Sequence, residues 1–111
     1  MNWTLLQSTD QLNKIKNHQG YSLIFKHSTR CSISMMAKRR FELDWDELPE
    51  DMPLYFLDLI QHRDISNQIV QQFHVHHESP QILILKNGEC VYDESHNGIS
   101  MQDIAEQVKI A

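Results

Sequence analysis

Short continuous hydrophobic runs and helically spaced apolar positions follow one another along the chain. The continuous runs have strand length and occupy residues 21–26, 54–60 and 81–86. Such runs are typical of strands buried on both faces. Between them, apolar residues recur at spacings of three and four, which predicts helices. These helices are expected at residues 9–18, from the first turn at Cys31 to near Trp45, from a cap at Asp64 or Ser66 to Phe73, and from Ser100 onward.

The connections between these segments complete the predicted fold. Asn87-Gly88 separates residues 81–86 from residues 89–93, and this dipeptide favours the turn of an antiparallel hairpin. Residues 46–53 hold two prolines and four acids, which predicts a solvated loop. A strand-helix-strand unit is right-handed and makes its two strands parallel. We therefore expect an α/β fold, with a four-stranded mixed sheet, helices on both faces and one extra N-terminal helix.

Length and composition narrow the class of protein. The 111 residues suit one domain, residues 1–111, with 41% hydrophobic and 23% charged positions. The first residues lack a basic start followed by an apolar segment, and no apolar run reaches the roughly 18 residues of a membrane span. We therefore expect a cytoplasmic protein with no membrane partner. The net charge of −5 argues against nucleic-acid binding.

The position of Cys31 is the first sign of chemistry. The chain has two cysteines, Cys31 and Cys90, and a structural disulfide is not expected in a reducing compartment. Cys31 falls at the first turn of a helix after a buried strand, where free backbone N–H groups and the helix dipole favour a thiolate. Lys26 and Arg30 can add positive charge. Cys31 is thus a candidate nucleophile for disulfide exchange, and the alternative is an inert core cysteine.

Two further residues bear on this thiol chemistry. Ser34 lies one helical turn after Cys31 and can donate a hydroxyl hydrogen bond to a thiolate, but it cannot displace that sulfur from a mixed disulfide. A single-thiol site of this kind therefore needs an outside thiol to complete a cycle. His27 precedes Cys31 by four residues, and it fits either a general base that tunes charge or a residue that orders the loop. Cys90, in the last strand, is expected to be a packing residue.

The motifs resemble a known family. The segments "FKHSTRCSIS" and "FHVHHESPQILILKNGECVYDESHNGIS" are similar to the monothiol bacilliredoxins, thioredoxin-like proteins of the bacillithiol system whose motif reads Thr-Cys-Pro-Ile-Ser. The resemblance runs over nearly the whole chain and implies a thioredoxin-like fold with Cys31 as the redox residue. Ile33 and Ser34 match the motif. Arg30 replaces threonine and Ser32 replaces proline, and these departures bear on substrate preference more than on reaction type.

The resemblance also implies a substrate site. A cis peptide bond is expected before Pro80, which leaves the Ser79 backbone to pair with an extended thiol substrate; the alternative is an ordinary trans bond. Bacillithiol carries a sugar and a malate, so Lys26, Arg30 and Lys38 are candidates to bind its carboxylates. The predicted catalytic residues are Cys31 and Ser34. The predicted substrate-binding residues are Lys26, Arg30, Ser32, Ile33, Ser79 and Pro80.

The leading functional hypothesis is a thiol-disulfide exchange enzyme without a cofactor. It would remove bacillithiol, or a similar small thiol, from mixed disulfides on cytoplasmic proteins, with a low-molecular-weight thiol or a partner redoxin as reductant. Two alternatives stay open: a glutaredoxin-like iron-sulfur or metal binding module, and a redox-inert docking domain. His74, His76 and His77 beside Glu78 have the residue types of a metal site, but their spacing favours surface histidines.

Overall fold

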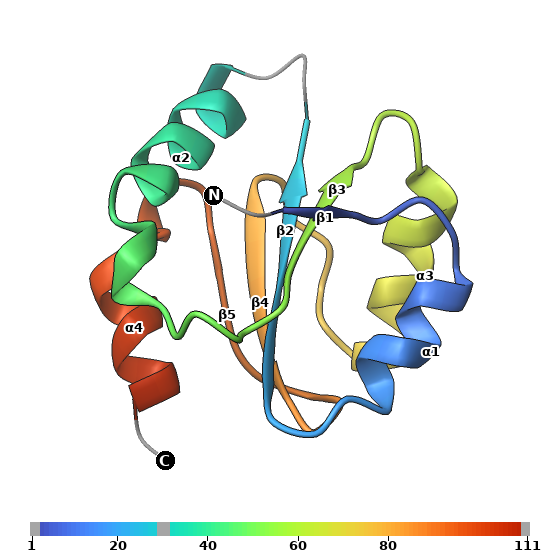
Figure 1. The fold of residues 1–111 in the computed structure, drawn as a ribbon. Helices are drawn as coiled ribbons and strands as arrows, with labels where there is room; N and C mark the ends of the chain where they lie inside the picture. Colours follow the sequence, from blue (N-terminus) through green and yellow to red (C-terminus); the bar gives the residue numbers. More distant parts are fainter. Residues whose placement is uncertain (1–2, 29–31, 110–111) are drawn as a thin grey trace.

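The computed structural model describes residues 3–28 and 32–109. These residues form a five-stranded mixed sheet that is covered by helices on both faces (Figure 1). The strands are β1 (Thr4–Leu5), β2 (Tyr21–His27), β3 (Leu54–Asp58), β4 (Gln81–Lys86) and β5 (Glu89–Ser95). The α-helices are α1 (Asp10–Lys16), α2 (Ser32–Leu43), α3 (Arg63–Phe73) and α4 (Met101–Lys109). Short 3₁₀ helices follow α2 and β5, at η1 (Trp45–Glu47) and η2 (His96–Gly98).

The sheet has the strand order β1-β3-β2-β4-β5. β1, β3 and β2 are parallel, whereas β4 is antiparallel to β2 and β5 is antiparallel to β4. The predicted α/β class and the mixed sheet are confirmed, but the prediction of four strands is wrong by one. β1 was missed because it is only two residues long and both side chains are exposed, so it carries no burial pattern.

The central strands are apolar along their length because both faces are covered. Leu23 and Phe25 of β2 belong to a cluster with residues of α2 and α4, whereas Ile24 belongs to a cluster with residues of α1 and α3. Figure 1 shows these two helix pairs on opposite sides of the sheet. The same alternation occurs in β4, where Ile82 and Leu83 face opposite clusters. Alternate side chains of a strand thus complete two separate cores.

Two predicted boundaries are corrected. α3 begins at Arg63 with His62 at its N-cap, and no side chain caps it, so neither Asp64 nor Ser66 has the predicted capping role. The Ser66 amide instead bonds the His62 carbonyl, which extends the helix upstream of that serine. β3 ends at Asp58 rather than at residue 60. The Asp58 carboxylate accepts the Ile60 amide at 3.1 Å, and this short-range turn ends the strand.

The predicted hairpin of β4 and β5 is confirmed. Asn87 and Gly88 both have positive φ, 54° and 83°, as expected for a tight turn that matches the twist of the strands. The tip of the hairpin is bonded to the turn after α1. The Asn87 side-chain oxygen accepts the Gly20 amide at 2.7 Å, and the Asn87 amide donates to the Gly20 carbonyl at 3.0 Å.

The side chain of Gln11 forms hydrogen bonds with backbone groups in and after the edge strand β1. The Gln11 side-chain oxygen accepts the amides of Gln7 and Ser8. Its nitrogen donates to the Leu5 carbonyl at 2.9 Å. On the other side, the Leu6 amide donates to Phe56 of β3 at 2.8 Å. The chain that follows β1 is therefore fixed both to the sheet and to the first turn of α1.

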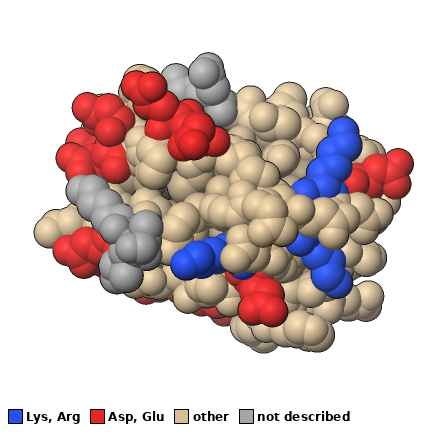
Figure 2. Space-filling model, turned by 60° about the horizontal axis from the view of Figure 1, so that its bottom comes forward, with Lys and Arg blue, Asp and Glu red and all other residues tan. Residues whose placement is uncertain are grey.

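The surface charge is uneven. On the face seen in Figure 2, most acidic side chains lie on the left of the view, and the described Lys and Arg side chains lie in the middle and on the right, where further acidic side chains lie beside them. Over the whole sequence the acids outnumber the bases, 15 to 10, which gives the net charge of −5. Within residues 3–28 and 32–109, no helix has the length and apolar character needed to cross a membrane.

Candidate active site

The predicted nucleophile lies between two described segments. β2 ends at His27, and α2 begins at Ser32. Arg30 and Cys31 lie outside the described residues, so their predicted roles stay predictions. The described elements that flank this gap in the sequence are the carboxyl end of β2 and the first turn of α2 (Figure 1). The loop of residues 74–80 follows α3 and leads into β4, where Gln81 pairs with Lys26 near the end of β2.

Ser34 and His27 form a buried pair at the start of α2. The Ser34 oxygen lies 2.7 Å from Nδ1 of His27, and it accepts the Ser28 amide at 3.0 Å. Ser34 is 0% exposed and His27 is 4% exposed. The hydroxyl therefore ties the first turn of α2 to the end of β2. These contacts agree with the loop-ordering role considered for His27, and they use the hydroxyl oxygen that was predicted to face the thiol.

The protonation of His27 decides what Ser34 can donate. Burial lowers the pKa of His27, and the nearby Lys38 ammonium lowers it further, against smaller opposing effects that include Asp58. The ring is thus neutral near pH 7. If Nδ1 carries no proton, Ser34 donates its only proton to the ring. If Nδ1 carries the ring proton, His27 donates and the serine proton is available to another acceptor.

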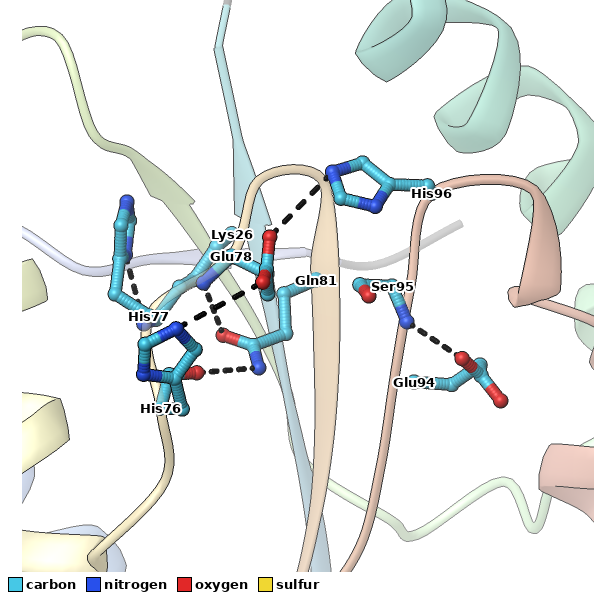
Figure 3. A network of polar contacts seen from close by, with 8 residues as sticks. All are labelled: Lys26, His76, His77, Glu78, Gln81, Glu94, Ser95 and His96. Carbon is cyan, nitrogen blue, oxygen red and sulfur yellow. Dashed lines mark hydrogen bonds and ion pairs between the residues drawn. The ribbon is translucent and has the colours of Figure 1, made fainter.

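Lys26 does not fit its predicted role as a direct ligand of substrate carboxylates. Its side chain is 0% exposed, and its Nζ lies 3.3 Å from Nδ1 of His77 (Figure 3). Burial lowers the pKa of this lysine to about 8. The prediction rested on the position of Lys26 at the end of a strand. It failed because alternate residues of β2 face opposite sides, and this one points into the space beside α3.

The peptide bond between Ser79 and Pro80 is cis, as expected. The Ser79 hydroxyl oxygen is buried and has no partner among the described residues. No hydrogen bond of the described residues uses the Ser79 backbone, whereas the Pro80 carbonyl accepts the His96 amide at 3.0 Å. Gln81 holds the preceding loop, because its side chain donates to the His76 carbonyl and accepts the Glu78 amide (Figure 3).

A pocket opens between α2 and β3, with a volume of about 670 Å³. This size is within the usual range for small-molecule sites. Met35, Met36 and Phe56 give it apolar walls, and Lys38 and Arg39 add positive charge. Its lining also includes Ser32, the residue after Cys31, together with His27 and Glu42. Ser32 itself is exposed and Ile33 is 49% exposed, so both predicted substrate-binding residues are open to solvent.

Lys38 is already engaged within this pocket. Its ammonium lies 3.0 Å from both carboxylate oxygens of Glu42 and 5.5 Å from the centre of the Phe56 ring. Glu42 also accepts the indole N–H of Trp3 at 2.9 Å. Arg39 is exposed and is not part of this network. Among the described residues Arg39 has no ion pair, so a ligand carboxylate in the pocket can bind it without first breaking one.

Within the described part of the chain, the histidine cluster does not bring three or more His, Cys, Asp or Glu side chains together as a metal ion would need. His76 is exposed, and its ring lies 3.9 Å from Glu78. The other oxygen of Glu78 lies 3.6 Å from His96, a contact that the sequence analysis did not foresee. His77 differs from its neighbours, because its ring contacts Lys26 and Ser66.

Cys90 has the environment of a packing residue. It is half-buried against the cluster beneath α1 and α3, and it carries a free thiol that donates to the Tyr92 carbonyl at 3.5 Å. Burial raises the pKa of this thiol to about 11. Cys90 is therefore protonated near neutral pH and a poor nucleophile.

Comparison with known proteins identifies the family. A sequence model described as monothiol bacilliredoxin BrxC matches residues 4–104. The chain belongs to the monothiol bacilliredoxin family. The resemblance inferred from the motif around Cys31 is therefore confirmed.

Solved structures agree with this assignment. A proposed oxidoreductase with a thioredoxin fold is 35% identical to this bacilliredoxin, covers 94% of it over 91% of its own chain, and has a TM-score of 0.82. The thioredoxin of Malassezia sympodialis is 20% identical, with a TM-score of 0.70 and coverage of 95% and 86%. That of Fasciola hepatica is 16% identical, with a TM-score of 0.70 and coverage of 95% of each chain. The fold is thioredoxin-like, and a thiol-disulfide redox role is supported.

Three contacts of this region were not predicted: His27 with Ser34, His77 with Lys26, and Gln81 with the loop of residues 74–80. A partial signal existed for two of them. His27 ends an apolar run and Gln81 begins one, and a polar residue at the boundary of a buried strand often bonds the adjoining loop. Nothing in the sequence distinguishes His77 from His76.

Proposed function

We propose that this bacilliredoxin removes bacillithiol from mixed disulfides on proteins, with Cys31 as its single nucleophile. The observation that carries the proposal is the family match over residues 4–104, which includes Cys31 directly before α2. A thiol immediately before a helix of this length lies near free amide groups and the positive end of the helix dipole. Both effects stabilise the thiolate that attacks a disulfide.

The proposed reaction has two exchange steps. The Cys31 thiolate attacks the bacillithiol sulfur of the mixed disulfide, a bond forms between these two sulfurs, and the client protein leaves as a thiolate that takes a proton from water. A second small thiol or a partner redoxin then attacks the bacillithiol sulfur on Cys31. This step restores the Cys31 thiolate and yields a new disulfide, so no further oxidant or reductant is needed.

The described residues support a division of the substrate between two places. No hydrogen bond among the described residues uses the Ser79 backbone, which leaves it available to an extended client segment. The pocket that begins at Ser32 is large enough for the small thiol, and Arg39 is available there for a carboxylate. Arg30 keeps its proposed role as a further cation. Lys26 has no place in this binding scheme, since its ammonium is buried.

Mass spectrometry of the reaction tests the proposal. The full chain is mixed with a protein carrying one bacillithiol mixed disulfide, and each chain is weighed intact and after digestion. We expect one bacillithiol adduct on Cys31, release of the client thiol, and neither change with Cys31→Ser. Cys90→Ser is the matched control and should behave like the native chain. An adduct on Cys90, or a client that stays modified, would refute the assignment.

A further inference from the structure

Lys26 is the buried charge that the proposed reaction leaves without a role. It lies at the carboxyl end of β2 with 0% exposure, and the described residues include no ion pair that would offset the burial of its charge. Its Nζ lies 3.3 Å from Nδ1 of His77. An ammonium group can only donate, so this ring nitrogen is the acceptor and the ring proton is on Nε2.

The same nitrogen has a second neighbour. The Ser66 hydroxyl of α3 lies 3.3 Å from Nδ1 of His77. The ring is thus held between the end of β2 and the first turns of α3. Arg63, His76 and Glu78 are the other charged or titratable groups that act on it, and burial is the main reason that the pKa of His77 is lowered. In a neutral ring with an unprotonated Nδ1, the single lone pair of this nitrogen is shared between the Lys26 ammonium and the Ser66 hydroxyl.

The loop that carries His77 is also held from the neighbouring strand. Gln81 is the register partner of Lys26. Its side chain donates to the His76 carbonyl at 2.9 Å and accepts the Glu78 amide at 3.3 Å (Figure 3). Facing residues of β2 and β4 therefore fix three consecutive loop residues. The next residue is Ser79, whose backbone is the proposed pairing site for the substrate.

We propose that Lys26 is a positioning residue, which through His77 fixes the loop of residues 76–79 so that the Ser79 backbone is aligned for the mixed-disulfide substrate. This inference rests on the proposed function for its substrate, but not for its geometry. In this proposal Lys26 acts on the loop through His77 and does not bind the substrate itself. We therefore expect its replacement to change substrate binding and to leave the ionisation of Cys31 as in the native chain.

Steady-state kinetics with a peptide carrying one bacillithiol mixed disulfide test the effect on binding. We expect Lys26→Met to raise KM about tenfold, the equivalent of about 1.4 kcal/mol, while kcat and the pH profile of Cys31 alkylation stay as in the native chain. Lys86→Met is the matched control, because Lys86 is exposed at the other end of β4. A native KM in a folded Lys26→Met variant would overturn the proposal.

A double-mutant cycle tests whether the effect passes through His77. His77→Phe should raise KM to a similar degree, and the double variant should be no worse than either single one, because both remove the same contact. Multiplied effects would overturn the proposed route. If Lys26→Met fails to fold, His77→Phe alone still tests the contact, and a native KM in a folded His77→Phe variant would overturn the proposal.

Nuclear magnetic resonance of the substrate-free chain separates this inference from the proposed function. At pH 7 we expect an unprotonated Nδ1 and a protonated Nε2 in His77, and a shift of the Ser79 amide resonance in Lys26→Met but not in Lys86→Met. A proton on Nδ1, or an unmoved Ser79 resonance, would overturn the inference. If the native chain leaves the mixed-disulfide peptide unchanged, the proposed function fails while these spectra still decide the role of Lys26.

Discussion

The described hydrogen bonds of the Ser34 hydroxyl link the first turn of α2 to the end of β2. The hydroxyl accepts the Ser28 amide and shares a proton with His27, and both of these partners are at the end of β2. The serine is thus a structural junction as well as a candidate donor to the thiolate. The two roles are compatible when His27 carries its proton on Nδ1, because the serine proton is then available. The tautomer of His27 therefore connects the stability of this junction to the chemistry proposed for Cys31.

Removal of this hydroxyl should destabilise the fold. Ser34→Ala leaves the His27 nitrogen and the Ser28 amide without their buried partner, and we expect a loss of about 1–3 kcal/mol in the free energy of unfolding. Urea denaturation measures this loss. Ser32→Ala is the control, since Ser32 is exposed on the same helix, and its effect should stay within about 0.5 kcal/mol. Equal effects of both variants would contradict the junction role.

At the scale of single residues, the sequence predicted the junction of β2 and α2 but not the contacts of the side chains around it. The position of Cys31 between a buried strand and a helix was readable, because apolar runs and helical spacing are local signals. The burial of Lys26 could not be predicted from the sequence, because it depends on Ser66 and His77, which lie far along the chain. The Ser34 contact with His27 escaped for a related reason: both residues were identified, but no local pattern pairs them.

Among the elements, the hairpin tip and the turn after α1 act as one unit. Asn87 bonds Gly20 through both its side chain and its backbone. Gly88 lies so close to α1 that an added Cβ would overlap the carbonyl oxygen of Lys16. The turn that joins β4 to β5 therefore also holds the end of α1 against the sheet.

The two glycines of this unit give a matched pair of substitutions. Gly20 has a φ of +97° and open space around its missing Cβ, so Gly20→Ala should cost only the conformational strain of about 1–2 kcal/mol. Gly88→Ala adds the overlap with Lys16, and we expect a loss above about 3 kcal/mol. Thermal or urea unfolding of both variants measures the difference. A smaller loss for Gly88→Ala would contradict the close packing of α1 on the turn.

The long elements were predictable because each carries a periodic signal. The strand runs, the Asn87-Gly88 turn and the order of helices all follow from local patterns. β1 lacks such a signal, since its two residues are exposed and owe their conformation to pairing with β3. The start of α3 was misplaced because Asp64 and Ser66 have good capping side chains, whereas the backbone turn at His62 sets the boundary.

In the whole molecule, two buried polar side chains, His27 and Lys26, lie on opposite faces of the sheet. His27 lies beside Phe56 on the α2 side, with ring centres 5.2 Å apart, and Lys26 lies on the α3 side near His77. Burial lowers the pKa of both His27 and Lys26. Each of these two side chains therefore loses its proton more readily in the folded chain than in the unfolded chain. The free energy of unfolding depends on pH through both groups.

The alkaline side of this dependence can be assigned to Lys26. Its pKa is about 8 in the folded chain and about 10.5 without the fold, so between these values the unfolded chain binds more protons. The free energy of unfolding therefore gains a positive contribution from Lys26 as pH rises through this window. Urea titrations from pH 7.5 to about 10 should show that Lys26→Met lacks this gain and Lys86→Met keeps it. Parallel curves for all three chains would contradict the assignment.

The bonds of Gln11 at the rim of β1 have a consequence for association between molecules. An unprotected outer strand offers its carbonyl and amide groups to any extended chain, which promotes aggregation through added strands. Here the Leu5 carbonyl is already bonded by one side-chain amide from the next helix. The Gln11 amide occupies an acceptor that an added strand would need, and this contact disfavours polymerisation at the β1 edge of the sheet.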